Sequence, residues 1–156
     1  MTIRFVKVPS PFGELTITSN GDAVTACTLD WRAPDDADVI SGDDLPVLAK
    51  ARADLAAYFA GALTDFDFPL APAGTPFQIR AWREMRCIPC GQTVTYGELA
   101  RKVGNPQGAR AIGMACNRNP IMIIIPCHRV VGAGGNLTGY ACGLPMKEAL
   151  LALERR

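Results

Sequence analysis

The sequence predicts an α/β protein in two parts, with a β-sheet and one helix in the first half and a helix-turn-helix in the second. Three short runs within residues 3–29 alternate between apolar and polar side chains, as half-buried strands do. Capped helical segments follow residue 74 instead. Residues 71–76, Ala-Pro-Ala-Gly-Thr-Pro, separate the two patterns and have the composition of a linker. We therefore expect two domains, residues 1–73 and residues 74–156.

The first domain is expected to contain three consecutive strands and a helix. The pair Asn20-Gly21, between the second and third alternating runs, is a strong short signal for a β-hairpin. An acidic, proline-bearing stretch then predicts a surface loop, and a helical pattern after it ends at Gly61, a suitable C-cap. The strands are expected at residues 3–8, 14–18 and 23–29, the loop at 33–44, the helix at 45–61 and a further alternating run at 65–69.

The second domain is expected to be mainly helical. Thr75 can cap a helix that has Pro76 at its first position. Thr95 and Glu98 have the spacing of a capping box for the next helix. A turn containing Gly104 joins that helix to another short one, which is the helix-turn-helix pattern. The helices are expected at residues 76–87, 96–103, 107–117 and 145–156, with an apolar strand at 121–125 that leads to Cys127.

The composition is that of a globular protein without a membrane-spanning segment. Hydrophobic residues make up 49% of the 156 residues and charged residues 20%, which excludes a disordered chain. The longest apolar run is far too short to cross a bilayer, and the start of the chain has no signal-peptide pattern. We therefore expect a cytoplasmic protein whose six cysteines are mostly reduced.

Charge is distributed unevenly along the chain. Residues 1–74 contain 5 Lys or Arg and 11 Asp or Glu, whereas residues 75–156 contain 11 and 4. A basic second half suggests that this half binds a polyanion, although the two halves could also simply attract each other. The helix expected at 107–117 is rich in Gly and Ala, with Arg110 as its one charge. Its small side chains suit close packing against a neighbouring helix, or entry into a narrow DNA groove with Arg110 reaching between bases.

The cysteines offer two candidate sites. Cys87 and Cys90 have C-x-x-C spacing, but no second pair completes a zinc site and no βαβ pattern supports a redox motif. Cys127 follows a β-branched run and precedes His128, the only histidine. A neighbouring imidazole can convert a thiol into the nucleophilic thiolate. Cys127 is therefore either a nucleophile or an inert buried cysteine, and this pair of residues leaves both interpretations open.

The segment Ile-Pro-Cys-His-Arg-Val-Val at 125–131 resembles the active-site signature of the O6-alkylguanine-DNA alkyltransferases, also called methylated-DNA–protein-cysteine methyltransferases. The resemblance covers residues 74–154 in family order and favours a nucleophilic Cys127. It implies an α/β (α+β) fold, with a ribonuclease-H-like antiparallel β-sheet and helix followed by a winged helix-turn-helix domain that carries the active site. The other matching motifs are Gly74-Thr75-Pro76-Phe77-Gln78, Thr95-Tyr96-Gly97-Glu98-Leu99-Ala100, Ala109-Arg110-Ala111-Ile112-Gly113, Arg118-Asn119-Pro120 and Leu137-Thr138-Gly139-Tyr140.

The resemblance implies direct repair of O6-methylguanine, and less efficiently of O4-methylthymine, in DNA. In such repair the nucleotide rotates out of the duplex, with Arg110 filling the space and Tyr96 crowding the phosphate. Cys127 as thiolate then takes the alkyl group irreversibly, so each molecule acts once. By the same resemblance, His128 takes the thiol proton through a water, Glu154 orients the imidazole, and the Tyr96 hydroxyl protonates the departing guanine.

The resemblance also implies residues that bind DNA and the base. Asn119 would brace the turn before the active-site segment. The implied DNA-binding residues are Thr95, Tyr96, Gly97, Asn105, Gln107, Ala109 and Arg110. The implied substrate pocket contains Cys116, Val130, Tyr140 and Ala141. No metal or other cofactor is implied, the partner is double-stranded DNA that contains O6-alkylguanine, and a monomer is expected in solution.

The chain departs from some relatives, and three other functions remain as alternatives. Ala141 replaces a serine and Cys142 a glycine at the pocket, and the zinc ligands of some relatives have no counterparts. A non-catalytic sensor of alkylated DNA usually has tryptophan in place of the cysteine. A cysteine hydrolase usually takes its histidine from a distant segment. In the third alternative, a winged-helix binding module, Cys127 would be incidental.

Overall fold

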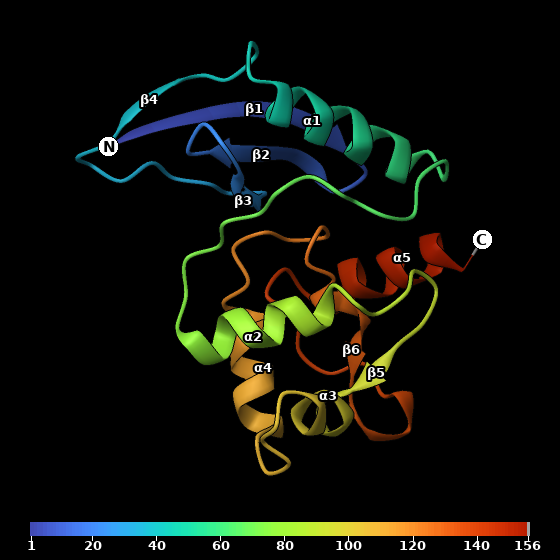
Figure 1. Ribbon diagram of the computed structural model, residues 1–156. Helices are drawn as coiled ribbons and strands as arrows, with labels where there is room; N and C mark the ends of the chain where they lie inside the picture. The colour runs from blue at the N-terminus through green and yellow to red at the C-terminus, as the bar shows by residue number, and fades with distance from the viewer. Residues whose placement is uncertain (156) are drawn as a thin grey trace. The chain divides into compact units, whose positions relative to one another are not determined.

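The computed structural model describes residues 1–155, and the chain divides into two compact units, Met1–Ala73 and Gly74–Arg156. Figure 1 shows a sheet with a helix in the first unit and a mainly helical second unit, which confirms the predicted fold class. The last residue of the helix expected at 145–156, Arg156, lies outside the described residues. Within residues 1–155, no helix has the length and apolar character needed to span a bilayer.

The first unit is built on a four-stranded sheet in the order β3-β2-β1-β4. Its first three strands are consecutive and antiparallel, as the alternating pattern predicted. The side chain of Asn20 accepts hydrogen bonds from the backbone N–H groups of Asp22 and Ala23, which closes the β2–β3 hairpin. The elements are β1 (Thr2–Ser10), β2 (Gly13–Ser19), β3 (Val24–Thr28), β4 (Asp38–Ser41) and α1 (Pro46–Phe59). The core of this unit includes Val6, Val8, Leu15, Ile17, Leu48 and Leu55, all at most 2% exposed.

The sheet is mixed, which corrects two expectations. Strand β4 pairs in parallel with β1, so the sheet is not wholly antiparallel. The same pairing shows that the loop predicted at 33–44 contains a strand at its centre. Parallel pairing joins segments that are distant in sequence, and an exposed edge strand needs no apolar alternation. The acidic sequence of this segment therefore carried no local signal for a strand.

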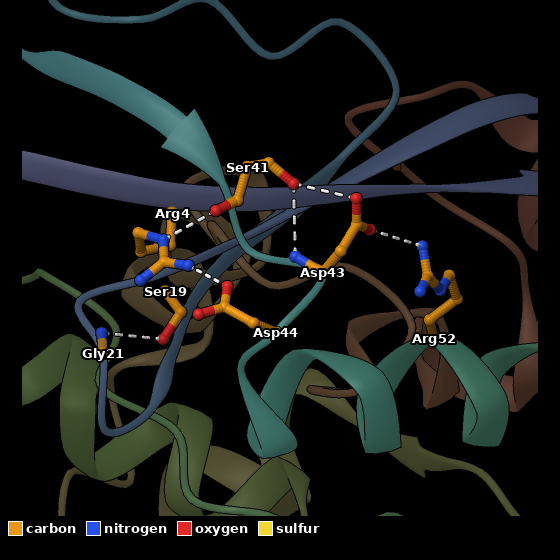
Figure 2. Close-up of polar contacts among 7 residues, drawn as sticks. All are labelled: Arg4, Ser19, Gly21, Ser41, Asp43, Asp44 and Arg52. Carbon is orange, nitrogen blue, oxygen red and sulfur yellow. Dashed lines mark hydrogen bonds and ion pairs between the residues drawn. The ribbon is translucent and has the colours of Figure 1, made fainter.

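Residues at the end of β4 and directly after it connect this strand to β1 and α1 (Figure 2). The guanidinium of Arg4 donates to the carbonyl oxygen of Ser41 at 2.7 Å and forms an ion pair with Asp44. The hydroxyl of Ser41 donates to Asp43 at 2.8 Å, and Arg52 of α1 pairs with the other carboxylate oxygen of Asp43 at 3.1 Å. The acidic residues thus fix the end of β4 between a strand and a helix.

Residues 65–69 do not form the strand that their alternation suggested. The connection makes an isolated bridge, between Val24 and Leu70. The two phenylalanines of the alternating run pack instead in a cluster of aromatic rings, with centroids 5.6 Å apart for Tyr58 and Phe66 and 6.0 Å apart for Phe66 and Phe68. Their spacing reflects this cluster and not a sheet.

The second unit contains the predicted helices. The capping boxes at the starts of α2 and α3 are both complete, with Thr75 paired to Gln78 and Thr95 paired to Glu98. Trp82 donates its indole N–H to a backbone carbonyl in α4 at 2.8 Å and so joins α2 to α4. The helices are α2 (Pro76–Met85), α3 (Tyr96–Lys102), α4 (Ala109–Asn117) and α5 (Leu144–Glu154). Helices α3 and α4 are therefore the expected helix-turn-helix, although α4 begins two residues later than predicted.

The apolar segment at 121–125 is a buried turn and not the expected strand. The side chain of Asn119 accepts the N–H of Ile121 at 2.9 Å and donates to the carbonyl of Ile125 at 2.9 Å. Between them, Ile123 adopts φ +73°, which a β-branched residue rarely does. The Asn119 side chain thus makes hydrogen bonds to backbone groups that a neighbouring strand would otherwise pair with. The segment therefore folds back on itself.

A short parallel pair of strands brings the end of this turn to the helix-turn-helix. β5 (Val94–Thr95) pairs with β6 (Val130–Val131). Because α3 starts directly after β5, the pairing places the start of α3 beside the chain that follows Cys127. Two 3-10 helices complete the unit, η1 (Cys127–Arg129) before β6 and η2 (Ala133–Gly135) after it.

Candidate active site

Cys127 is the first residue of η1, directly after the buried turn. It is 3% exposed, and its Sγ accepts a hydrogen bond from Asn119 Nδ2 at 3.2 Å. The amide that closes the turn therefore also fixes the position of the sulfur. Asn119 thus contacts both the turn and the thiol.

The environment of Cys127 favours the protonated thiol. Burial raises its pKa to about 11. The hydrogen bond from Asn119 and the charge of Lys147 act in the opposite direction, but burial is the larger effect. Near neutral pH the group is a thiol, so a nucleophilic reaction at this sulfur requires a base.

Glu154, the last residue of α5, joins His128 to Arg129 in the interior. One carboxylate oxygen lies 2.7 Å from His128 Nε2 and accepts from Arg129 Nη2 at 2.9 Å, and the other accepts from Arg129 Nε at 2.8 Å. Arg129 also donates to the carbonyl of Ile88 at 2.7 Å. The side chains of His128 and Glu154 are both 0% exposed. Two basic side chains thus share one buried carboxylate.

This arrangement determines the tautomer of His128. A carboxylate only accepts hydrogen bonds, so the imidazole hydrogen is on Nε2, facing Glu154. Burial lowers the pKa of His128, while Glu154 acts to raise it, so the ring is neutral near pH 7. The other nitrogen, Nδ1, is buried and has no hydrogen-bond partner within residues 1–155. Nδ1 is therefore able to accept a proton.

A second cluster of polar side chains contacts the carbonyl oxygen of Thr138. The Tyr96 hydroxyl donates to it at 2.8 Å and Lys147 Nζ at 3.1 Å. Lys147, which is 0% exposed, also donates to the carbonyls of Val130 at 2.7 Å and Gly139 at 3.2 Å. Its ammonium lies 5.7 Å from the centroid of the Tyr96 ring. Lys147 thereby ties β6 to the loop at 138–139.

Burial changes the proton affinity of both groups. It lowers the pKa of Lys147 and raises that of Tyr96. The thiols of Cys116 and Cys127 add to the rise for Tyr96. Tyr96 therefore keeps its proton at neutral pH and is available as a donor.

The residues expected to bind DNA lie on α3, on α4 and on the turn between them. Thr95 is the N-cap of α3, where its hydroxyl oxygen accepts from the N–H of Glu98 at 3.1 Å. Arg110, the second residue of α4, is exposed, and its side chain forms no ion pair or hydrogen bond with another described residue. Of the others, Asn105, Gln107 and Ala109 are exposed and Gly97 is partly exposed.

The contacts in the structure bring together only some of the residues expected in the substrate pocket. Val130 is buried in β6, where its N–H donates to the carbonyl of Cys127 and its carbonyl accepts from Lys147. Each of these carbonyl oxygens has a second lone pair for a further donor. Tyr140 is partly exposed and Ala141 exposed, on the loop that precedes α5.

Two further thiols interact electrostatically with that of Cys127. Cys116 of α4 is 7% exposed, and its pKa is raised by burial and then by the nearby Cys127. Cys142, at the pocket loop, slightly raises the pKa of Cys127, and its sulfur lies 3.4 Å from that of Met122. Both cysteines therefore belong to the surroundings of the candidate nucleophile.

Two family models match the chain, one in each of its two units. Residues 3–72 match the ribonuclease-like domain of 6-O-methylguanine DNA methyltransferase, and residues 76–156 match its DNA-binding domain. The chain belongs to this family. The resemblance seen in the active-site motif is thus confirmed. The C-terminal unit of this methyltransferase family member corresponds to the DNA-binding domain.

Individual relatives of this methyltransferase family match over most of the chain. A protein of Mycolicibacterium paratuberculosis named methylated-DNA–protein-cysteine methyltransferase is 44% identical over 154 residues, which are 99% of this chain and 93% of the relative. A protein of the same name from Methanosarcina acetivorans is 59% identical over 105 residues, 67% of each chain. The crystal structure of Mycobacterium tuberculosis OGT in complex with DNA superimposes with a TM-score of 0.87 at 43% identity, and covers 99% of this chain and 93% of that one.

Two residues in the site of this methyltransferase family member were missed by sequence reasoning. Arg129 lies within the active-site motif, but its ion pair with Glu154 joins segments 25 residues apart. The burial of Lys147 could have been predicted from the sequence. Lys147 lies three and four residues before Leu150 and Leu151, on the apolar face of α5. The described residues contain no group of three or more His, Cys, Asp or Glu that could hold a metal ion.

Proposed function

We propose that this protein repairs O6-methylguanine in double-stranded DNA by transferring the methyl group to Cys127, with O4-methylthymine as a poorer substrate. The observation that carries the proposal is a buried thiol, held at 3.2 Å by Asn119, beside a buried His128 with one unused acceptor nitrogen. Relatives named as methylated-DNA–protein-cysteine methyltransferases add support. We also propose that the protein acts as a monomer in the cytoplasm and without a cofactor.

The modified nucleotide must first leave the duplex, because its methyl group is otherwise enclosed in the base stack. In the proposal, Arg110 fills the space left behind, and its exposed, unpaired guanidinium supports this role. Tyr96, at the start of α3, crowds the phosphate of the rotated nucleotide. The proposed contacts to the DNA backbone are Thr95, Gly97, Asn105, Gln107 and Ala109.

The direction of the hydrogen bond between His128 and Glu154 determines how Cys127 loses its proton. A pKa of about 11 keeps the sulfur protonated until substrate is bound, which limits reactions with other electrophiles. The thiol proton passes through a bridging water to His128 Nδ1, and His128 Nε2–H remains bonded to Glu154. Glu154 then stabilises the imidazolium, and the same carboxylate forms an ion pair with Arg129.

Methyl transfer is a single displacement. A bond forms between Cys127 Sγ and the methyl carbon as the bond from carbon to O6 breaks, and its electron pair stays on guanine. Tyr96 donates the proton that neutralises the base, exchanging its present acceptor, the Thr138 carbonyl, for guanine. The ammonium of Lys147, near the Tyr96 ring, stabilises the negative charge that develops there. The product is a thioether, which is not hydrolysed, so each molecule acts once.

The proposed pocket holds guanine between backbone and loop. The carbonyl oxygens of Cys127 and Val130 keep lone pairs for the amino group of the base. Tyr140 and Ala141 form the opposite side, and Cys116 lies beneath. Because Ala141 has no side-chain hydroxyl, only its backbone N–H is available to bind the O6 side of the base.

Mass spectrometry after one incubation tests the proposal. The protein is mixed with a duplex oligonucleotide carrying one O6-methylguanine, and its tryptic peptides are weighed. We expect a single added methyl group on the peptide that contains Cys127, one per molecule of protein. Cys127→Ser should prevent the transfer, whereas Cys87→Ser, a change at an exposed cysteine, should not. Repair without this adduct, or repeated repair by one molecule, would refute the mechanism, and binding without transfer would indicate a non-catalytic sensor.

A further inference from the structure

The exposed face of α4 carries an apolar side chain that the proposed chemistry does not use. Met114 is 55% exposed and is one of four large hydrophobic side chains that residues 1–155 expose. Helical spacing places it on the same face as Arg110, four residues before it, and close to Arg118, the C-cap residue four after it. The opposite face of the helix is buried and consists of Ile112, Ala115 and Cys116.

The two arginines on this face lack partners in the described part of the chain. Neither the side chain of Arg110 nor that of Arg118 forms an ion pair or a hydrogen bond with residues 1–155. The surface next to Met114 is also open, because a Cβ added to Gly113 would have no atom within 4 Å. The face therefore combines cations without counter-ions and an apolar side chain that is 55% exposed, on a helix of the DNA-binding domain.

Duplex DNA has the matching chemistry. Its phosphates neutralise unpaired arginines, and the deoxyribose carbons that line a groove offer an apolar surface. Methionine is among the apolar residues that minor-groove proteins place against DNA. A thioether has no hydrogen to donate and accepts only weakly, so it cannot distinguish base edges. Such a contact suits a repair protein that must act in any sequence.

We propose that Met114 is a DNA contact, packed against the sugars of the minor groove beside the phosphate bound by Arg118. The inference rests on the proposed function, since the occupant is duplex DNA. It assigns to α4 two separable kinds of binding, an apolar one at Met114 and an ionic one at Arg118. Only the ionic one depends on the release of counter-ions from DNA.

Titrations at several salt concentrations separate these two contributions. The full-length protein in a Cys127→Ser background, which holds substrate without reacting, is titrated into a fluorescent duplex with one O6-methylguanine. Met114→Ala is expected to weaken binding roughly fivefold, since about half of this side chain is exposed in the free protein and becomes buried. The slope of log K against log salt should stay unchanged. Arg118→Gln should instead reduce that slope by about 1.

Two further variants test whether apolar character or size matters. Met114→Leu should bind within about twofold of the parent, whereas Met114→Gln, which has a similar length but a polar end, should bind as weakly as Met114→Ala. Ile40→Ala, which removes an exposed apolar side chain of the N-terminal unit, is the matched control and should not change binding. Thermal unfolding of each variant should stay within about 2 °C of the parent, because Met114 is a surface residue.

The outcomes separate this inference from the proposed function. Unchanged binding by Met114→Ala, or parental binding by Met114→Gln, would overturn it. A smaller salt slope for Met114→Ala would also overturn it, because the contact would then be ionic. Methylation of Cys127 in the wild-type protein on the same duplex is measured separately. Its absence would refute the proposed function while the DNA contact could still be observed.

Discussion

Replacement of Gly113 by alanine should stabilise the protein and weaken its binding to DNA. Gly113 lies inside α4 with ordinary helical geometry, and an added Cβ would have no protein atom within 4 Å. Glycine in a helix interior costs about 0.5–1 kcal/mol relative to alanine. Gly113→Ala should therefore raise the free energy of unfolding by that amount. For a chain of this length the midpoint of thermal unfolding should rise by roughly 1–4 °C.

The loss of DNA binding has a separate cause. In the proposed complex α4 enters a narrow groove, so the new methyl group would meet DNA and no part of the protein. Overpacking by one methyl group commonly costs 1–3 kcal/mol, so we expect the dissociation constant to rise at least about fivefold. Calorimetry of the protein alone and titration of a Cys127→Ser background with duplex DNA measure the two effects.

Gly108→Ala is the control with the opposite sign. A Cβ at this position would lie 2.6 Å from Asn105 Nδ2, so the variant should unfold at a lower temperature. If Gly113→Ala raises the unfolding temperature and leaves DNA binding unchanged, close approach of α4 to DNA is refuted. If it lowers the unfolding temperature, the space inferred around Gly113 is wrong.

Five further predictions concern the site itself. Glu154→Gln leaves a buried arginine without its counter-charge and should cost about 3–5 kcal/mol in chemical unfolding, with slower methylation in single-turnover assays. Reaction of Cys127 with a small alkylating reagent should accelerate with pH up to about 11, and a plateau below pH 9 on its peptide would contradict the assigned burial effect. Because burial lowers the pKa of His128, single-turnover repair should persist down to pH 6.5 and be lost only below it; loss beginning above pH 7 would show a raised pKa instead. Lys147→Met removes the donor of three carbonyls and a charge that lowers the pKa of Cys127, so denaturant unfolding should show a destabilised protein and the alkylation profile should move to higher pH. Arg110→Ala should slow repair of duplex DNA but largely preserve reaction with a free O6-alkylguanine base, and equal losses would mean that Arg110 shapes the pocket.

Elements specified by local interactions were predicted well from the sequence. The hairpin at Asn20-Gly21 and the capping boxes at Thr75 and Thr95 depend on side chains within three residues of the backbone groups they bond. The same holds for the helix-turn-helix, whose turn contains Gly104 at φ +83°. Such features need no tertiary context, so the residue pattern is sufficient to place them.

Two segments differed from prediction because distant or unusual partners decide them. β4 is a strand because it pairs in parallel with β1, more than thirty residues earlier in the chain. Residues 121–125 have the composition of a buried strand, yet the side chain of Asn119 bonds both ends of the segment and turns it. Apolar composition indicated burial correctly in the second case, but burial alone does not distinguish a strand from a turn.

By itself the sequence determined which family the protein belongs to and which cysteine is the candidate nucleophile, since motif identity and short spacings are sufficient for both. Only the tertiary structure decided the chemical state of that cysteine. Its raised pKa, the tautomer of His128 and the shared carboxylate of Glu154 all result from burial and from partners on separate segments. The same is true of Lys147, which the fold buries against three carbonyl oxygens. Proton affinity depends on solvent exclusion and on distances between groups, and these are properties of the folded chain.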